Sequence, residues 1–191
     1  MCNREFTSAE RRARRTVVSV DLTYSAVGAT RIESLTWPSV PAGFRAYERT
    51  VRVGSGDDAW QAARAAVLSW GIKTRSGFEV VAADGTTGAV RAGADYTLVA
   101  RIGPLRIREP ARVVAVVDSA TRAGFAYGTR VGHPVSGEEA FIVTRDDDGS
   151  VWLTLRSLTR AARGPWRAVF PLILVAQRAY RIRYLRALRG V

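Results

Sequence analysis

The feature that most constrains the fold is a series of segments in which apolar and polar residues alternate. Alternation with a period of two is typical of strands that bury one face. Turn residues separate the segments, most clearly Asp147-Asp148-Gly149 between the last two. Short connections of this kind join antiparallel neighbours, so we predict an antiparallel sheet. The predicted strands cover residues 44–53, 78–83, 96–102, 112–118, 123–130, 138–145 and 151–158. Along the last of these, Val151 and its alternate neighbours are predicted to face the core and Arg156 the solvent.

Two segments have helical periodicity instead. After the turn at Gly54–Gly56, apolar residues recur at helical spacing as far as Trp70, and Gly71 is expected to close this one shorter helix. The second segment is the C-terminal one, which forms a long amphipathic helix from Trp166 and should lie across the sheet. Four of its arginines fall on the far side: Arg167, Arg178, Arg186 and Arg189. The inner row is Trp166, Val169, Phe170, Ile173, Gln177, Tyr180, Tyr184 and Leu188.

The length of 191 residues suits a single domain. We predict a basic flexible arm over residues 1–15 and one domain over 16–191. The one cysteine, Cys2, cannot form an intramolecular disulfide, which is consistent with a reducing cytoplasm. The longest apolar run, residues 168–176, is far shorter than the ~20 residues that span a bilayer.

The net charge of +12 calls for an explanation. Nearly every cation is arginine, with Lys73 the only lysine, and the arginines are spread along the chain. Clusters occur only at residues 11–15 and near the C-terminus, without the aromatic pattern of RNA-binding proteins. Solvated surface is therefore favoured over nucleic-acid binding, which is expected to be unlikely.

The hairpin at residues 124–141 contains the only histidine and a loop of about seven residues, longer than a hairpin needs. By parity Glu139 shares a face with Tyr127 and lies opposite Tyr127 or Thr129, while Glu138 points away. A carboxyl group beside a phenol in a partly apolar cavity has a raised pKa, which suits general acid or base chemistry. His133, at the cavity mouth, could then shuttle a proton.

A structural role explains the same residues. Gly132-His133-Pro134 forms a rigid turn, the carboxylates of residues 138 and 139 satisfy loop amides, and Tyr127 fills the core with its hydroxyl bonded to Glu139. No nucleophile and base pair is present in the sequence. Metal binding is not expected, because one histidine and no usable cysteine leave only carboxylates, and Asp146-Asp147-Asp148 reads as a solvated turn.

Several motifs occur together: Leu22-Thr23-Tyr24, Val27-Gly28-Ala29-Thr30, Val53-Gly54-Ser55-Gly56, Gly124-Phe125-Ala126-Tyr127-Gly128-Thr129, Gly132-His133-Pro134, Gly137-Glu138-Glu139 and Arg183-Tyr184-Leu185. This set resembles the bacterial and plant family catalogued as domain of unknown function 1990. The order of elements also resembles the helix-grip arrangement of START and Bet v 1-like proteins. The resemblance implies an α+β fold in which a curved antiparallel sheet of about seven strands wraps a long C-terminal helix and leaves a cavity. It implies no activity.

The leading functional hypothesis is binding of a small molecule, apolar or amphipathic and possibly anionic, between the sheet and the C-terminal helix. No cofactor is expected, and the oligomeric state is left open. The alternatives are a metal-independent cyclase, isomerase or hydrolase that uses Glu139, Tyr127 and His133, and a basic adaptor for nucleic acid or anionic membrane. The predicted ligand-binding residues are Tyr127, Glu139, Gln177, Tyr180, Tyr184, Phe125 and Phe141.

Overall fold

The computed structural model describes residues 22–37, 39–86 and 88–190. Cys2 and the predicted arm over residues 1–15 lie outside this part of the chain. All neighbouring strands of the seven-stranded sheet are antiparallel, in the order β1-β7-β6-β5-β4-β3-β2. The predicted antiparallel sheet is therefore confirmed. The strands are β1 (Arg45–Ser55), β2 (Phe78–Ala82), β3 (Asp95–Ile102), β4 (Leu105–Asp118), β5 (Arg122–Thr129), β6 (Val135–Arg145) and β7 (Ser150–Ala161).

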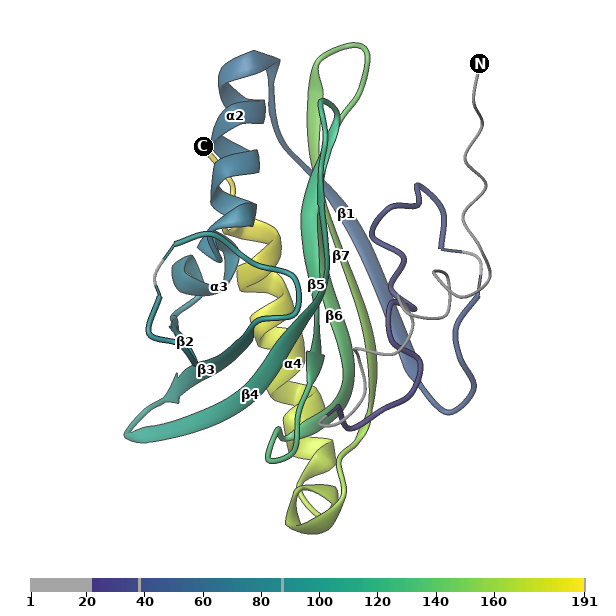
Figure 1. Ribbon diagram of the computed structural model, residues 1–191, viewed down its shortest axis with the longest axis vertical. Coiled ribbons are helices and arrows are strands. Elements are labelled where there is room, and N and C mark those ends of the chain that lie inside the picture. The colour runs from purple at the N-terminus through teal and green to yellow at the C-terminus, as the bar shows by residue number, and fades with distance from the viewer. Residues whose placement is uncertain (1–21, 38, 87, 191) are drawn as a thin grey trace, which may run out of the picture.

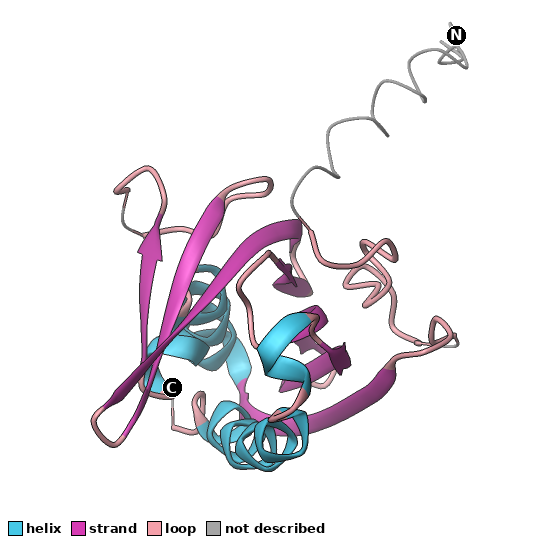
Figure 2. Cartoon of the chain, turned by 90° about the horizontal axis from the view of Figure 1, so that it is seen from below, coloured by secondary structure: helices cyan, strands magenta, loops and turns pink. Residues whose placement is uncertain are grey.

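The helices lie on one side of the sheet, which curves around them (Figures 1 and 2). They are α2 (Gly56–Leu68), α3 (Gly71–Arg75), the 3₁₀-helix η1 (Gly164–Arg167) and α4 (Phe170–Arg186). The predicted α+β helix-grip architecture is thus confirmed. No helix in the described ranges is long and apolar enough to cross a bilayer.

The one shorter helix predicted after β1 consists of two pieces, α2 and α3. Trp70 separates them because its backbone is left-handed, with φ of 62°. This conformation turns the indole into the core, where its centroid lies 4.5 Å from that of Phe125. Gly71, expected to close the helix, instead begins α3, and Lys73 comes to lie inside the molecule. Pro171 stands in the first turn of α4, where a missing N–H costs nothing.

The outer face of β5, β6 and β7 is covered by residues 22–37, which we call the strap (purple in Figure 1). Ile32 packs there against Ala126 and Ile142. Arg156, predicted to meet solvent, is only 2% exposed, so that prediction is wrong. Its guanidinium donates hydrogen bonds to carbonyl oxygens of Thr30, Arg31, Ser34 and Leu35 and to the carboxylate of Glu48. Carbonyl groups of the strap take the place of water around this charge, so the buried guanidinium still has hydrogen-bond partners.

Candidate functional site

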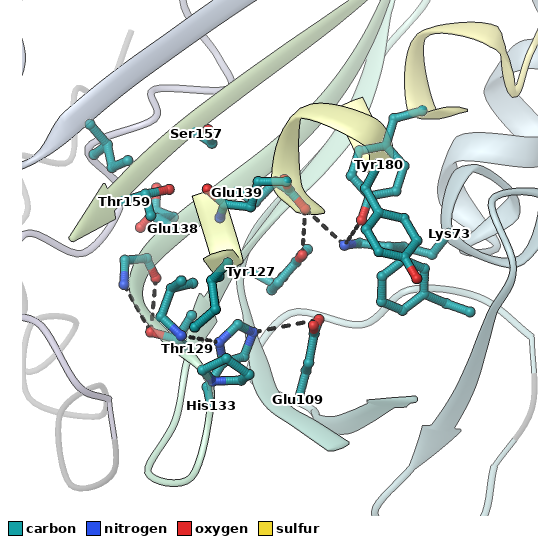
Figure 3. Close-up of a pocket in the computed structure, with 18 residues that line it drawn as sticks. Lys73, Glu109, Tyr127, Thr129, His133, Glu138, Glu139, Ser157, Thr159 and Tyr180 are labelled. Atoms are coloured by element: carbon teal, nitrogen blue, oxygen red, sulfur yellow. Dashed lines mark hydrogen bonds and ion pairs between the residues drawn. The ribbon is translucent and has the colours of Figure 1, made fainter. Parts of the chain in front are cut away.

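A cavity of about 70 Å³ lies between the β5–β6 hairpin, α3 and α4 (Figure 3). At the ~10–15 Å³ that one water molecule requires, it holds roughly five waters or a molecule of similar size. Part of its border is apolar, from Phe78, Ile173 and Leu158. Polar side chains border it from both strands of the hairpin and from the inner row of α4. The predicted space between the sheet and the C-terminal helix is therefore present, and it is small.

Glu139 is the centre of a buried hydrogen-bonded chain at this cavity. It pairs with Tyr127 in the β5–β6 register, as parity predicted. The Tyr127 hydroxyl donates to Glu139 Oε2 at 2.5 Å, and Lys73 Nζ lies 2.8 Å from the same oxygen. Lys73 Nζ also donates to the Tyr184 hydroxyl at 2.7 Å. Burial, followed by the charge of Glu139, raises the pKa of both tyrosines, so their hydroxyls stay protonated.

Sequence reasoning missed Lys73. Its side chain is 2% exposed, and its ammonium lies 4.4 Å from the centroid of the Phe78 ring and 4.5 Å from that of Tyr184. These cation–π contacts add to its ion pair with Glu139 and its hydrogen bond to Tyr184 in holding the buried ammonium. The signal was available, because Lys73 is the only lysine in a chain with 29 basic residues.

Glu109 is the second missed residue. It lies in the first half of β4, which begins at Leu105, whereas alternation predicted a start at Arg112. Its side chain is 18% exposed, borders the cavity and makes no hydrogen bond within the described residues. Burial raises the pKa of Glu109 to about 7; the positive charge of Lys73 opposes the rise and the negative charge of Glu139 adds to it. This carboxyl group can therefore give or take a proton near neutral pH.

His133 lies in the β5–β6 connection, as the sequence predicted, but its side chain is buried. Its Nδ1 accepts a hydrogen bond from the Val135 N–H at 3.1 Å, so the proton of the neutral ring is on Nε2. That Nε2 is buried without a hydrogen-bond partner in the described chain, 3.7 Å from Glu109 Oε2. Burial, aided by the charge of Lys73, lowers the pKa of His133 to about 3. A ring that stays neutral near pH 7 favours a hydrogen-bonding role over proton shuttling.

The low pKa of His133 predicts a loss of stability in mild acid. Between pH 6.5 and 3 the unfolded chain binds a proton at this ring that the folded chain does not, so the folded state weakens as the pH falls. The variant His133→Asn has no such group to titrate, and its amide oxygen can accept the hydrogen bond from the Val135 N–H. Between pH 8 and 4.5 we expect its free energy of unfolding to fall by about 3 kcal/mol less than that of the wild type. Urea unfolding from pH 8 to 4.5 measures the difference. Glu109 has the opposite dependence, since its raised pKa favours the folded state below pH 7, but both proteins contain it. Parallel stability curves for wild type and variant would contradict the prediction.

The predicted residues of α4 lie together on the inner side of that helix. Gln177, Tyr180 and Tyr184 all border the cavity. The Oε1 atom of Gln177 is buried without a hydrogen-bond partner among the described residues. Two other predicted ligand contacts, Phe125 and Phe141, do not border the cavity and pack in the core.

Glu138 points to the opposite face, as parity predicted, and is 2% exposed beneath the strap. Its Oε2 accepts hydrogen bonds from the Tyr24 hydroxyl and the Gly28 N–H, both at 2.7 Å. Its Oε1 accepts from the N–H and the hydroxyl of Thr30. This carboxylate satisfies loop amides, as the structural interpretation of the hairpin expected. The described chain holds no group of three His, Cys, Asp or Glu side chains placed to bind a metal ion.

Comparison with known proteins places the chain in a family. The model of the family described as Domain of unknown function (DUF1990) matches residues 23–187. The chain belongs to this family. A curated relative of this DUF1990 protein, the UPF0548 protein of Deinococcus radiodurans, is 36% identical over 162 residues, which cover 78% of each chain. The resemblance seen in the sequence motifs is thereby confirmed.

Two solved structures are similar to this DUF1990 protein. The crystal structure of hypothetical protein jhp0584 from Helicobacter pylori superposes with a TM-score of 0.55 and 14% identity, over 81% of this chain and 94% of that one. Ara h 8.0201 has a TM-score of 0.47 and 13% identity, over 76% and 99%. At such identities the likeness to jhp0584 concerns the fold alone.

Proposed function

We propose that this DUF1990 protein binds a small amphipathic molecule in the cavity between the sheet and α4. One observation carries the proposal: two buried hydrogen-bonding atoms at the cavity border, His133 Nε2 and Gln177 Oε1, have no partner in the described chain. A buried donor or acceptor without a partner costs about 1–3 kcal/mol, so such atoms are normally bonded to water or to a ligand. A molecule with an acceptor for the histidine and a donor for the glutamine would satisfy both. A cytoplasmic site of action is part of this proposal.

The size and charge of the cavity limit the ligand. About 70 Å³ accommodates a handful of non-hydrogen atoms and excludes a lipid chain unless α4 moves. The charged residues that border it are Lys73, Glu109, Glu138 and Glu139. Lys73 and Glu139 neutralise each other, and the Glu138 carboxylate is bonded to the strap on the other face of the sheet. Glu109, with a pKa of about 7, is partly ionised near neutral pH and gives the cavity a charge between zero and −1. This balance favours a neutral or cationic ligand over the anionic one suggested by the net charge of the chain.

Substitution of Gln177 tests the proposed contact. We expect Gln177→Leu, which keeps the size of the side chain and removes the acceptor, to weaken binding about tenfold or more, because a ligand donor would lose its partner. Native mass spectrometry of the purified protein would reveal a retained molecule, and NMR titration with small amides and alcohols would supply the affinities. Asp147→Asn in the exposed β6–β7 turn is the matched control. Equal affinities for wild type and Gln177→Leu would place the ligand elsewhere.

Metal-independent acid–base catalysis is a second candidate, and Glu109 is the observation that favours it. A carboxyl group with a pKa of about 7, with no protein hydrogen bond and facing the same cavity as the Tyr127–Glu139–Lys73 chain, can exchange protons with a bound molecule. Glu109→Gln separates the two functions. A binding protein would keep its affinity in this variant, whereas an enzyme would keep binding and lose turnover by a factor on the order of 100 or more.

A further inference from the structure

The outward side of α4 exposes large apolar side chains. Leu172 is 71% exposed, Val175 63% and Ile182 52%. At about 100° per residue these three and Ala179 fall within one narrow strip, opposite the inner row that borders the cavity. Soluble helices normally place charged residues in such positions, so a continuous exposed apolar strip indicates an interaction surface.

Arginines surround this strip. By the same helical geometry Arg178 lies along one edge and Arg183 along the other, and Arg186 falls at the C-terminal end of the strip itself. Arg189 follows in the turn just after the helix. All four are exposed, and within the described chain none forms an ion pair with a carboxylate. Residues 164–191 contain no Asp or Glu. We call the strip and these arginines the α4 outer face.

We propose that the α4 outer face docks on an anionic lipid surface. An apolar strip bordered by cations is the pattern of a helix that lies in the plane of the membrane interface, with its apolar side chains among the headgroups and its cations on the phosphates. Each arginine near such a surface contributes to attraction by the negative potential of anionic lipids. Because α4 remains packed on the sheet through Tyr184, docking requires no unfolding.

The chemistry of the face disfavours two other partners. A second copy docked through the same face would bring arginines against arginines with no carboxylate from residues 164–191 to offset them. Nucleic acid would engage the arginines but would leave Leu172, Val175 and Ile182 against phosphates and water. A lipid surface alone among these three matches both the apolar and the charged parts.

Vesicle flotation of the full chain tests the inference. We expect binding to vesicles of phosphatidylcholine with phosphatidylserine and almost none to phosphatidylcholine alone. The triple variant Arg178→Gln/Arg183→Gln/Arg189→Gln should lower the partition coefficient on the order of 100-fold, from three lost electrostatic contacts. Leu172→Ser/Val175→Ser/Ile182→Ser should lower it at least tenfold at unchanged net charge. Both sets lie on the surface, and circular dichroism checks the fold.

Matched control variants distinguish binding through the α4 outer face from non-specific attraction of a protein with a net charge of +12 to anionic vesicles. Arg45→Gln/Arg49→Gln/Arg52→Gln removes three exposed arginines from β1, and Leu105→Ser/Val131→Ser removes exposed apolar side chains from the start of β4 and from the β5–β6 connection. Both controls should bind like wild type. The inference is overturned if the controls lose as much binding as the α4 variants, or if deleting residues 1–15 alone abolishes binding. It is equally overturned if the protein does not bind vesicles that contain phosphatidylserine. Binding of the protein to duplex DNA or to an acidic protein instead, with the same dependence on the α4 residues, would also overturn it.

Discussion

Replacing Lys73 with methionine is expected to destabilise the protein by about 3–5 kcal/mol, the usual result of removing one partner from a buried ion pair. The thioether fills much of the space of the lysine stem and removes only the ammonium. Glu139, which is 16% exposed, would then keep its charge without a cation, and the Tyr184 hydroxyl would lose its donor. Urea unfolding at pH 7, followed by tryptophan fluorescence, measures the change.

Two companion variants identify the cause. Lys73→Met combined with Glu139→Gln should recover most of the lost stability, because a neutral amide replaces the orphaned carboxylate. Lys73→Arg, which keeps the positive charge, should still be destabilised, since the larger guanidinium has to be accommodated where the lysine side chain is only 2% exposed. A single Lys73→Met variant as stable as wild type would show that the pair contributes nothing to folding.

Replacing Glu138 with alanine is expected to lower the free energy of unfolding by about 3–5 kcal/mol and to release the strap from the sheet. Two backbone N–H groups, Gly28 and Thr30, and two hydroxyl groups lose their common acceptor in this variant. Donors that were buried against the sheet would then have to reach water, which the strap can do only by leaving. Trypsin cleavage after Arg31 reports this release directly, and urea unfolding gives the energy.

Glu138→Gln is the matched control, because its amide retains one acceptor oxygen and the size of the side chain. It should fall between wild type and Glu138→Ala in both stability and resistance of the strap to trypsin. Unchanged cleavage at Arg31 in the alanine variant would mean that Arg156 and the packing of Ile32 hold the strap without the carboxylate.

Much of the architecture was predictable because it depends on local periodicity. Alternation located the seven strands, and the β5–β6 register that pairs Tyr127 with Glu139 follows from parity within one hairpin. Helical spacing brought Gln177, Tyr180 and Tyr184 to the side of α4 that meets the cavity. Each of these inferences concerns residues that are close in sequence or carried by one regular element.

The rest was settled by contacts between distant segments. Lys73 meets Glu139 only because the left-handed Trp70 redirects the chain into α3. Arg156 is buried because strap carbonyls more than a hundred residues away accept its hydrogen bonds. Periodicity shows which face of an element a side chain occupies, but not what lies opposite that face. The burial of a charge, and with it the pKa of Glu109 or His133, depends on that opposite partner and is decided only when the chain has packed.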